Sequence, residues 1–276
     1  MNPPPAFTPD LDAYFARIGY TGSREPTRAT LDGILAAHAS AIPFENLAVL
    51  LGLPINLEPA AIERKLVHAK RGGYCFEQNT LLLHVLAALG YTVTPLSARV
   101  RLLLPREFTP PRTHLFLRVE IDGVPWLADV GVGSGSLTGA IRFDREGEQP
   151  TPHETRRLTS EGGIHYHQIK LGEEWSDVYE FTGEEMHLID REVANWWTST
   201  NAGSKFRQNL MAARAGPDGT RFGLRNREFT HRRGAAILER RELATPEELL
   251  EVLAQHFGLH FPAGTRFGPP GSPWPA

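Results

Sequence analysis

The sequence predicts an α+β fold, with helices in the first third of the chain and antiparallel strands after it. Apolar residues at helical spacing continue up to Gly90. From Tyr91 onward, runs rich in β-branched and apolar residues alternate with turn residues, which is typical of strands. Because these strands must pair with neighbours far along the chain, we expect a small barrel or a curled sheet. A capping box at residues 245–248 predicts one more helix, which ends at Gly258.

Four helices are expected before residue 90. They cover residues 11–15, 29–40, 59–67 and 75–89. Pro9 suits the first turn of the first helix, and Pro43 disfavours helix at the residue before it. Gly72 and Gly73 separate the last two helices.

The clearest supersecondary signal is a β-hairpin. Residues 114–121 and 124–130 flank Asp122-Gly123, a dipeptide that favours a two-residue turn. This turn fixes the register, and every pair on one face is then apolar, as a buried face requires. The pairs are Ile121 with Val124, Val119 with Trp126, Leu117 with Ala128, and Leu115 with Val130. Other strands are expected at residues 91–93, 97–104, 141–143, 164–171 and 175–181.

The other face of the hairpin carries His114 and Asp129 as diagonal neighbours. Diagonal Cβ atoms lie roughly 7 Å apart, which lets an imidazole and a carboxylate form a hydrogen bond. Cys75, the only cysteine, is expected in the first turn of helix 75–89, where the helix dipole favours a thiolate. Arg71 would add a positive charge nearby. The alternative is an inert buried thiol, which is the usual state of a lone cysteine.

A thiol, an imidazole and a carboxylate are the parts of a Cys-His-Asp constellation. Cys75 would attack an acyl carbonyl, His114 would move protons, and Asp129 would fix the tautomer of the imidazole. The sequence places His114 near Asp129 and leaves open whether Cys75 lies near His114.

Composition excludes several classes of protein. The chain has 276 residues, 41% of them hydrophobic and 22% charged, as in an ordinary globular protein. Its net charge of -3 and its lack of a basic block argue against nucleic-acid binding. A single cysteine excludes an intrachain disulfide, no signal peptide is recognisable, and no apolar run is long enough for a membrane span. We expect a cytoplasmic location.

Two further patterns have more than one interpretation. Residues 131–136, Gly-Val-Gly-Ser-Gly-Ser, lack the ending of a P-loop and the helix that follows a dinucleotide-binding turn. They form either a flexible turn or a stretch of backbone that approaches a ligand such as a phosphate. His165 and His167 have no third and fourth ligand at recognisable spacing, so we expect no metal site.

Five segments resemble the arylamine N-acetyltransferase family, in the same order along the chain. Residues 71–79, Arg-Gly-Gly-Tyr-Cys-Phe-Glu-Gln-Asn, match the family's RGGxCxExN signature. The histidine and aspartate segments are residues 113–115 and 129–131. Residues 43–47, and Ser199-Thr200 with Ser204 and Phe206, match two more. The resemblance covers nearly the whole chain.

The resemblance implies a helical bundle at residues 1–90, a β-barrel at 91–195 and an α/β lid at 196–276. It implies a cysteine-protease-like site in which Cys75, His114 and Asp129 are catalytic. The implied reaction is N-acetylation of aromatic amines and hydrazines by a ping-pong mechanism. Acetyl-CoA is the implied cosubstrate, and acetyl-cysteine is the intermediate.

The resemblance also implies supporting roles. It places Phe44 and Phe206 in the acceptor pocket and pairs Glu45 with Arg71 as structural support. It assigns cofactor contacts to Thr113, Gly131, Gly133 and Ser134. The phosphates of the cofactor would then lie beside the turn at residues 131–135.

Two departures from the family bear on acceptor preference and on contacts with CoA. The family often has an aromatic residue where this chain has Val132, and His-Pro where it has Asn201-Ala202. Three other functions share part of the pattern: an enzyme that closes an acyl chain onto an aromatic amine, a thiol hydrolase, and a binding module without activity. The acyl donor distinguishes the first, and hydrolysis without an amine distinguishes the second. The presence of all three constellation residues argues against the third.

Overall fold

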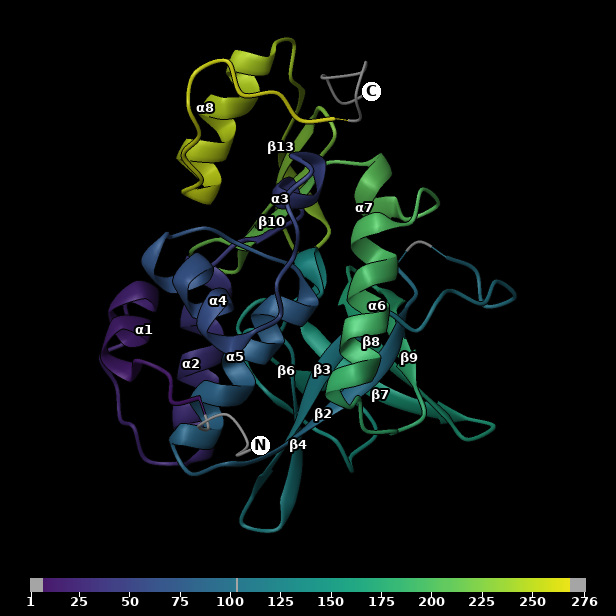
Figure 1. The fold of residues 1–276 in the computed structure, drawn as a ribbon. Helices are drawn as coiled ribbons and strands as arrows, with labels where there is room; N and C mark the ends of the chain where they lie inside the picture. The colour runs from purple at the N-terminus through teal and green to yellow at the C-terminus, as the bar shows by residue number, and fades with distance from the viewer. Residues whose placement is uncertain (1–6, 103, 269–276) are drawn as a thin grey trace.

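The computed structural model describes residues 7–102 and 104–268. Residue 103, part of the expected strand 97–104, and residues 1–6, where a signal peptide would begin, lie outside the described residues. Figure 1 shows three groups of elements: the N-terminal helices, an eight-stranded sheet, and a five-stranded sheet with the last helix beside it. The fold therefore has the predicted α+β class.

The N-terminal helices pack around one long helix, α5. The group consists of α1 (Leu11–Ile18), α2 (Arg28–Ala41), α3 (Leu47–Leu50), α4 (Pro59–Glu63) and α5 (Cys75–Ala88). The expected third helix is two elements, because α4 continues as a π-helical turn, η1 (Arg64–His68). Most side chains of α5 are buried, and in Figure 1 the helix lies between the other helices and the strands. This position puts the start of α5 close to the sheet.

The eight-stranded sheet runs in the order β5-β4-β3-β2-β9-β8-β7-β6, with antiparallel neighbours throughout. Its strands are β2 (Thr92–Val100), β3 (His114–Ile121), β4 (Val124–Ala128), β5 (Ile141–Arg142), β6 (Gln149–Pro150), β7 (Thr155–Glu161), β8 (Ile164–Leu171) and β9 (Glu174–Phe181). Side chains from β2, β3, β7, β8 and β9 share one buried core, which includes Phe116, Tyr179 and Phe181. The sheet is therefore the curled sheet that the sequence predicts.

The hairpin of β3 and β4 has the predicted register. Its pairs include Leu117 with Ala128, Val119 with Trp126, and Ile121 with Val124. Asp122 and Gly123 have φ values of 52° and 75°, the positive values that this two-residue turn requires. The apolar face shares a core with α5, whereas Phe116 on the other face contacts Tyr179 of β9. Leu115 and Val130 lie beyond the ladder, because β4 ends at Ala128.

The two strands expected at residues 91–93 and 97–104 are wrong as separate elements. They are one strand, β2, which passes through Pro95 and ends at Val100. Proline has no N–H group to donate to a neighbouring strand, so within a sheet it occurs where the side of the strand that its nitrogen faces has no regular partner strand. At Pro95, β2 pairs with β3 on one side and on the other meets only a short segment, through the isolated bridge between Leu96 and Glu185. Pro95 O accepts from Met186 N–H there at 2.9 Å, and the pairing with β9 begins only at Arg99.

The five-stranded sheet includes a strand from the N-terminal part. Its order is β1-β10-β11-β12-β13, with β1 (Phe44–Glu45), β10 (Met211–Ala215), β11 (Thr220–Arg225), β12 (Glu228–Arg233) and β13 (Ala236–Glu242). Apolar side chains of α8 (Pro246–Phe257) pack in the core of this sheet. Along the chain, α6 (Leu188–Thr200) and α7 (Lys205–Gln208) come after β9 and before β10. Among the described residues, no helix has the length and apolar character needed to cross a membrane.

Candidate active site

Cys75 is the first residue of α5. The side chains of Glu77 and Gln78, which follow Cys75 in the helix, bind the backbone of residues that precede it. Glu77 Oε2 accepts a hydrogen bond from Tyr74 N–H at 3.2 Å. Gln78 Nε2 donates to Pro43 O at 3.0 Å. Cys75 itself is 4% exposed. The polar residues of the 71–79 segment therefore fix the path by which the chain enters the helix and places the thiol.

His114 and Asp129 form a buried pair. His114 Nε2 lies 2.8 Å from Asp129 Oδ2, and the two residues are 1% and 0% exposed. Asn79 Nδ2 donates to Asp129 Oδ1 at 2.8 Å and to Leu115 O at 2.7 Å. Asn79 Oδ1 accepts from Val130 N–H at 3.1 Å. Both oxygens of the carboxylate are therefore bound, and one side chain of α5 connects both arms of the hairpin.

Cys75 lies against His114. Its Sγ is 3.6 Å from the carbonyl oxygen of Thr113, the residue before His114. Burial lowers the pKa of His114, but the charge and hydrogen bond of Asp129 and the hydrogen bond and charge of Cys75 together raise it to about 10. The imidazole is therefore protonated at neutral pH when it faces a thiolate, which is the reactive form of the cysteine. The structure thus brings together the two side chains whose proximity the sequence left open.

The turn at residues 131–136 begins against the cysteine. A Cβ atom on Gly131 would lie 2.7 Å from Cys75 Cα, so a larger residue would push the turn away from the thiol. Further along, a Cβ atom on Gly133 would lie 3.3 Å from the ring of Phe44. The turn therefore extends from Cys75 to the aromatic residue expected in the acceptor pocket.

The backbone of this turn changes conformation sharply between Val132 and Gly133. Val132 has φ and ψ values of -95° and 10°, and Gly133 follows with a φ of 78°. A right-handed residue followed by a left-handed one directs successive N–H groups toward a common point. Within the described part of the chain, the N–H groups of Val132, Gly133 and Ser134 donate to no protein acceptor. They are free to bind a negatively charged group.

Phe44 and Phe206 lie together. Their ring centroids are 6.1 Å apart in an edge-to-face arrangement, and Phe206 also contacts Tyr74 at 5.3 Å. Phe44 belongs to β1 and Phe206 to α7. The aromatic wall is thus assembled from two distant parts of the chain, next to the residue that precedes Cys75.

Arg71 binds the buried carboxylate of Glu45. The distance from Arg71 Nη2 to Glu45 Oε1 is 3.1 Å, and Glu45 is 1% exposed. The guanidinium also lies over the ring of Phe261, at 4.5 Å. The charge of Arg71 is therefore paired with Glu45, and the imidazole of His114 is the cation that contacts Cys75.

Two residues of the site were given no role from the sequence, although Asn79 is the last residue of the 71–79 signature. Asn79 follows Cys75 by four positions, so it lies on the same side of α5, and it is polar in a largely apolar helix. That combination is a usable signal. Tyr179 packs its ring against His114 at 5.0 Å, but nothing local marks it among the aromatic residues of the strands. In the described residues, no group of three His, Cys, Asp or Glu side chains could hold a metal ion.

Comparisons with known proteins agree in sequence and in fold. A family model described as N-acetyltransferase matches residues 27–265. The arylamine N-acetyltransferase of Escherichia coli (strain K12) is 40% identical over 252 residues, which cover 91% of this chain and 89% of the relative. The solved structure of the arylamine N-acetyltransferase from Mycobacterium tuberculosis superposes with a TM-score of 0.87 at 40% identity, covering 90% of this chain and 93% of that one.

A related enzyme has been solved with a bound cofactor. The Mycobacterium marinum arylamine N-acetyltransferase in complex with CoA gives a TM-score of 0.86 at 37% identity, covering 90% of this chain and 92% of that chain. The family model spans more than half of this chain, and the relatives match it over most of both lengths. The chain belongs to the arylamine N-acetyltransferase family.

Proposed function

We propose that the chain N-acetylates aromatic amines and aromatic hydrazines with acetyl-CoA, by a ping-pong mechanism through acetyl-Cys75. The observation that carries this proposal is the buried line of contacts from Cys75 through His114 to Asp129. Acetyl-CoA as donor is supported by the relative from M. marinum that was solved with CoA. Amine acceptors are supported by the names of the relatives, and the Salmonella typhimurium relative is also named as an N-hydroxyarylamine O-acetyltransferase.

In the first half-reaction, His114 already holds the proton of Cys75 as an imidazolium, and the thiolate attacks the thioester carbonyl. Glu77 N–H donates to Tyr74 O at 2.9 Å, whereas the N–H groups of Cys75 and Phe76 at the start of α5 have no intrahelical acceptor, so these two would favour the oxyanion that forms there. The carbon–sulfur bond to CoA then breaks, and the departing CoA sulfur takes the proton from His114. Cys75 holds the acetyl group as a thioester, so the transfer exchanges one thioester for another and is nearly balanced.

The second half-reaction uses the change that acetylation makes around His114. The acetylated sulfur carries no charge, so the contribution of Cys75 to the raised pKa of His114 is lost. The imidazole therefore gives up its proton more readily than in the free enzyme and can act as a base. An arylamine attacks as the neutral species, and its nitrogen transfers a proton to His114 while the carbon–nitrogen bond forms. The carbon–sulfur bond breaks and restores the thiolate–imidazolium pair.

The remaining roles are assigned by position. Phe44 and Phe206 would flank the ring of the acceptor, since edge-to-face contacts favour an aromatic guest. Thr113 and the turn residues Gly131, Gly133 and Ser134 would contact CoA, with the free N–H groups directed at its phosphates. The Glu45–Arg71 pair would support the loop that leads to Cys75. We assign the nucleophile to residues 1–90, His114 and Asp129 to 91–195, and the lid to 196–276.

Intact mass spectrometry tests the proposal directly. The wild type and Cys75→Ala are mixed with acetyl-CoA and no amine, and an arylamine or arylhydrazine is added afterwards. We expect one acetyl group on the wild type, none on the variant, and discharge by the amine. If the wild type gains no acetyl group while its thiol reacts quickly with iodoacetamide, the nucleophile is real and acetyl-CoA is not its donor. An acyl-chain-closing enzyme or a hydrolase would then describe the chain better.

A further inference from the structure

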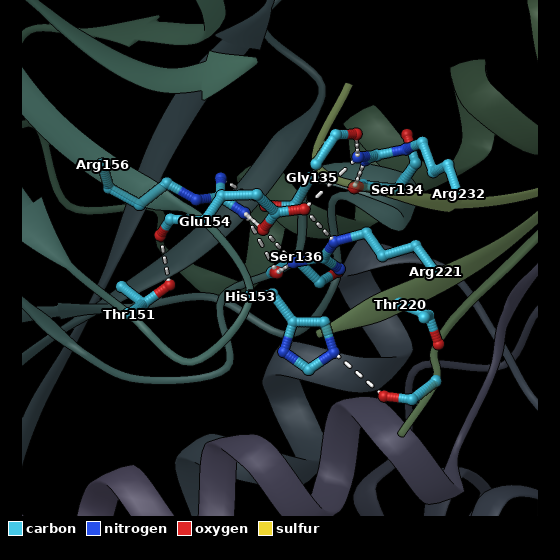
Figure 2. Close-up of polar contacts among 12 residues, drawn as sticks. Ser134, Gly135, Ser136, Thr151, His153, Glu154, Arg156, Thr220, Arg221 and Arg232 are labelled. Atoms are coloured by element: carbon cyan, nitrogen blue, oxygen red, sulfur yellow. Dashed lines mark hydrogen bonds and ion pairs between the residues drawn. The ribbon is translucent and has the colours of Figure 1, made fainter. Parts of the chain in front are cut away.

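Glu154 is the centre of a buried ion cluster that connects the two sheets. Its carboxylate binds Arg221 at 2.6 Å, Arg156 at 3.0 Å and Arg232 at 3.4 Å. Arg156 belongs to β7 of the eight-stranded sheet, whereas Arg221 and Arg232 belong to β11 and β12. Figure 2 shows the three guanidinium groups converging on Glu154, and we call these four residues the Glu154 cluster.

Each guanidinium of the Glu154 cluster also donates to a carbonyl of the turn at residues 131–136. The contacts are Arg156 Nη1 to Gly135 O at 2.9 Å, Arg221 Nη2 to Ser136 O at 2.8 Å, and Arg232 Nη2 to Ser134 O at 3.2 Å. On the other flank, Ser136 N–H donates to Gly133 O at 3.0 Å and Leu137 N–H donates to Asp129 O at 2.7 Å. The carbonyls of residues 134–136 are thus held by the arginines. The N–H groups of residues 132–134, which have no protein acceptor among the described residues, lie at the start of the same turn.

A purely stabilising role explains this arrangement poorly. Buried ion clusters are often no more stabilising than apolar side chains of the same volume. Here three arginines share one carboxylate, and Arg156 and Arg221 are 0% and 2% exposed. Burial raises the pKa of Glu154, but the three guanidinium groups lower it to about 2, so the carboxylate is ionised at every working pH. Apart from one bond from Arg232 Nη1 to Gly234 O at 2.7 Å, the other hydrogen bonds that the three guanidinium groups donate go to the turn beside Cys75.

We propose that Glu154, acting through Arg156, Arg221 and Arg232, is a positioning residue for the acyl donor. It orients the three guanidinium groups, which hold the 131–136 turn in the conformation that receives the phosphate-bearing part of CoA. The inference rests on the proposed function, because it takes CoA as the donor. The proposal also gives Arg221 of β11 an indirect role at the donor site, because Arg221 holds the turn and does not touch the donor.

The test compares two acyl donors in Glu154→Gln and in a matched control. One donor is acetyl-CoA, and the other is p-nitrophenyl acetate, which has no phosphate. The control is Glu180→Gln. Glu180 lies on β9, pairs with the buried Arg101 at 2.8 Å and does not contact the turn. Steady-state kinetics with a fixed arylamine give KM and kcat for each donor, and urea unfolding reports stability.

We expect Glu154→Gln to raise the KM for acetyl-CoA by about tenfold or more, because a loosened turn presents its N–H groups poorly. The kinetics with p-nitrophenyl acetate and the rate of alkylation by iodoacetamide should stay within about twofold of the wild type. Glu180→Gln should lose stability without a change in donor preference. Equal losses with both donors would reduce Glu154 to a structural role and overturn the proposal, and so would a fall in the KM for acetyl-CoA.

A second variant keeps the test decisive if Glu154→Gln does not fold. Arg232→Gln removes the hydrogen bond to Ser134 O from the half-buried edge of the cluster and leaves Glu154 paired with its two buried arginines. We expect the same donor-selective change with a smaller magnitude, and an unchanged donor preference would overturn the proposal. Failure of the proposed function is seen separately, because the wild type itself would then gain no acetyl group from acetyl-CoA.

Discussion

Asn79 is the residue whose loss should damage the site most without removing a reacting group. Its side chain makes three hydrogen bonds, one to the carboxylate of Asp129 and two to backbone groups of Leu115 and Val130. A buried hydrogen bond to a charged group contributes about 1.5–3 kcal/mol, and a neutral one contributes about 0.5–1.5 kcal/mol. We therefore expect Asn79→Ala to lower the free energy of unfolding by about 4 kcal/mol, measured by urea denaturation.

The same substitution should slow the chemistry, because it releases one oxygen of Asp129. A displacement of a catalytic group by about 1 Å reduces a rate roughly 100-fold, so acetylation of Cys75 by acetyl-CoA should slow by about 10- to 100-fold. Alkylation by iodoacetamide should slow as well, because a displaced Asp129 raises the pKa of His114 less and leaves less imidazolium beside the sulfur.

Asn46→Ala is the matched control. Asn46 is also buried and also makes three hydrogen bonds, but all of them go to backbone groups outside the His114–Asp129 pair. It should lose about 3 kcal/mol of stability and keep the wild-type rate of alkylation by iodoacetamide. The reasoning fails if Asn79→Ala also keeps that rate, since Asn79 would then be a structural residue without influence on Asp129.

Three further predictions concern the acceptor wall and two titrating groups. Phe206→Ala should raise the KM for arylamines by about tenfold, because it removes an edge-to-face partner, and should leave acetylation of Cys75 by acetyl-CoA without an amine unchanged. The pKa of His114 is raised to about 10, so its stabilising effect is complete below pH 6.5 and is lost toward pH 10. The stability difference between the wild type and His114→Asn should therefore shrink over that range of urea measurements; a constant difference would contradict the raised pKa. The pKa of Glu154 is lowered from 4.5 to about 2, so the stability difference between the wild type and Glu154→Gln should be full above pH 4.5 and shrink toward pH 2. A difference that grows with acidity would mean that this carboxylate is not ionised in the folded protein.

Local chemistry explains what the sequence could predict. Asp122-Gly123 allows one turn type, and a slip by one residue would turn the apolar face of the hairpin to water. His114 and Asp129 therefore follow from a few adjacent residues. Their partner Cys75 does not, because its approach depends on how α5 packs against the hairpin, which no local pattern encodes.

The parts that were missed depend on contacts between distant segments. The Glu154 cluster takes one residue from the loop before β7, one from β7 and two from the five-stranded sheet, and its members are ordinary charged residues when read in order. The strands β10 to β13 were also missed. Their arginines and glutamates hide the alternation that marks a strand, since much of this sheet is partly exposed.

The site exists where two cores meet at the end of a strand. α5 packs on the apolar face of the hairpin, whereas His114 projects from the opposite face toward Tyr179. A side chain of α5 cannot reach that face through the sheet, so the contact forms at the first residue of β3, with Cys75 against Thr113. Asn79, four residues later and about 6 Å further along the helix, reaches Asp129 around the same edge. One face of one helix therefore carries both Cys75, the proposed nucleophile, and Asn79, which binds the carboxylate of Asp129, so the registers of the helix and the hairpin cannot shift independently.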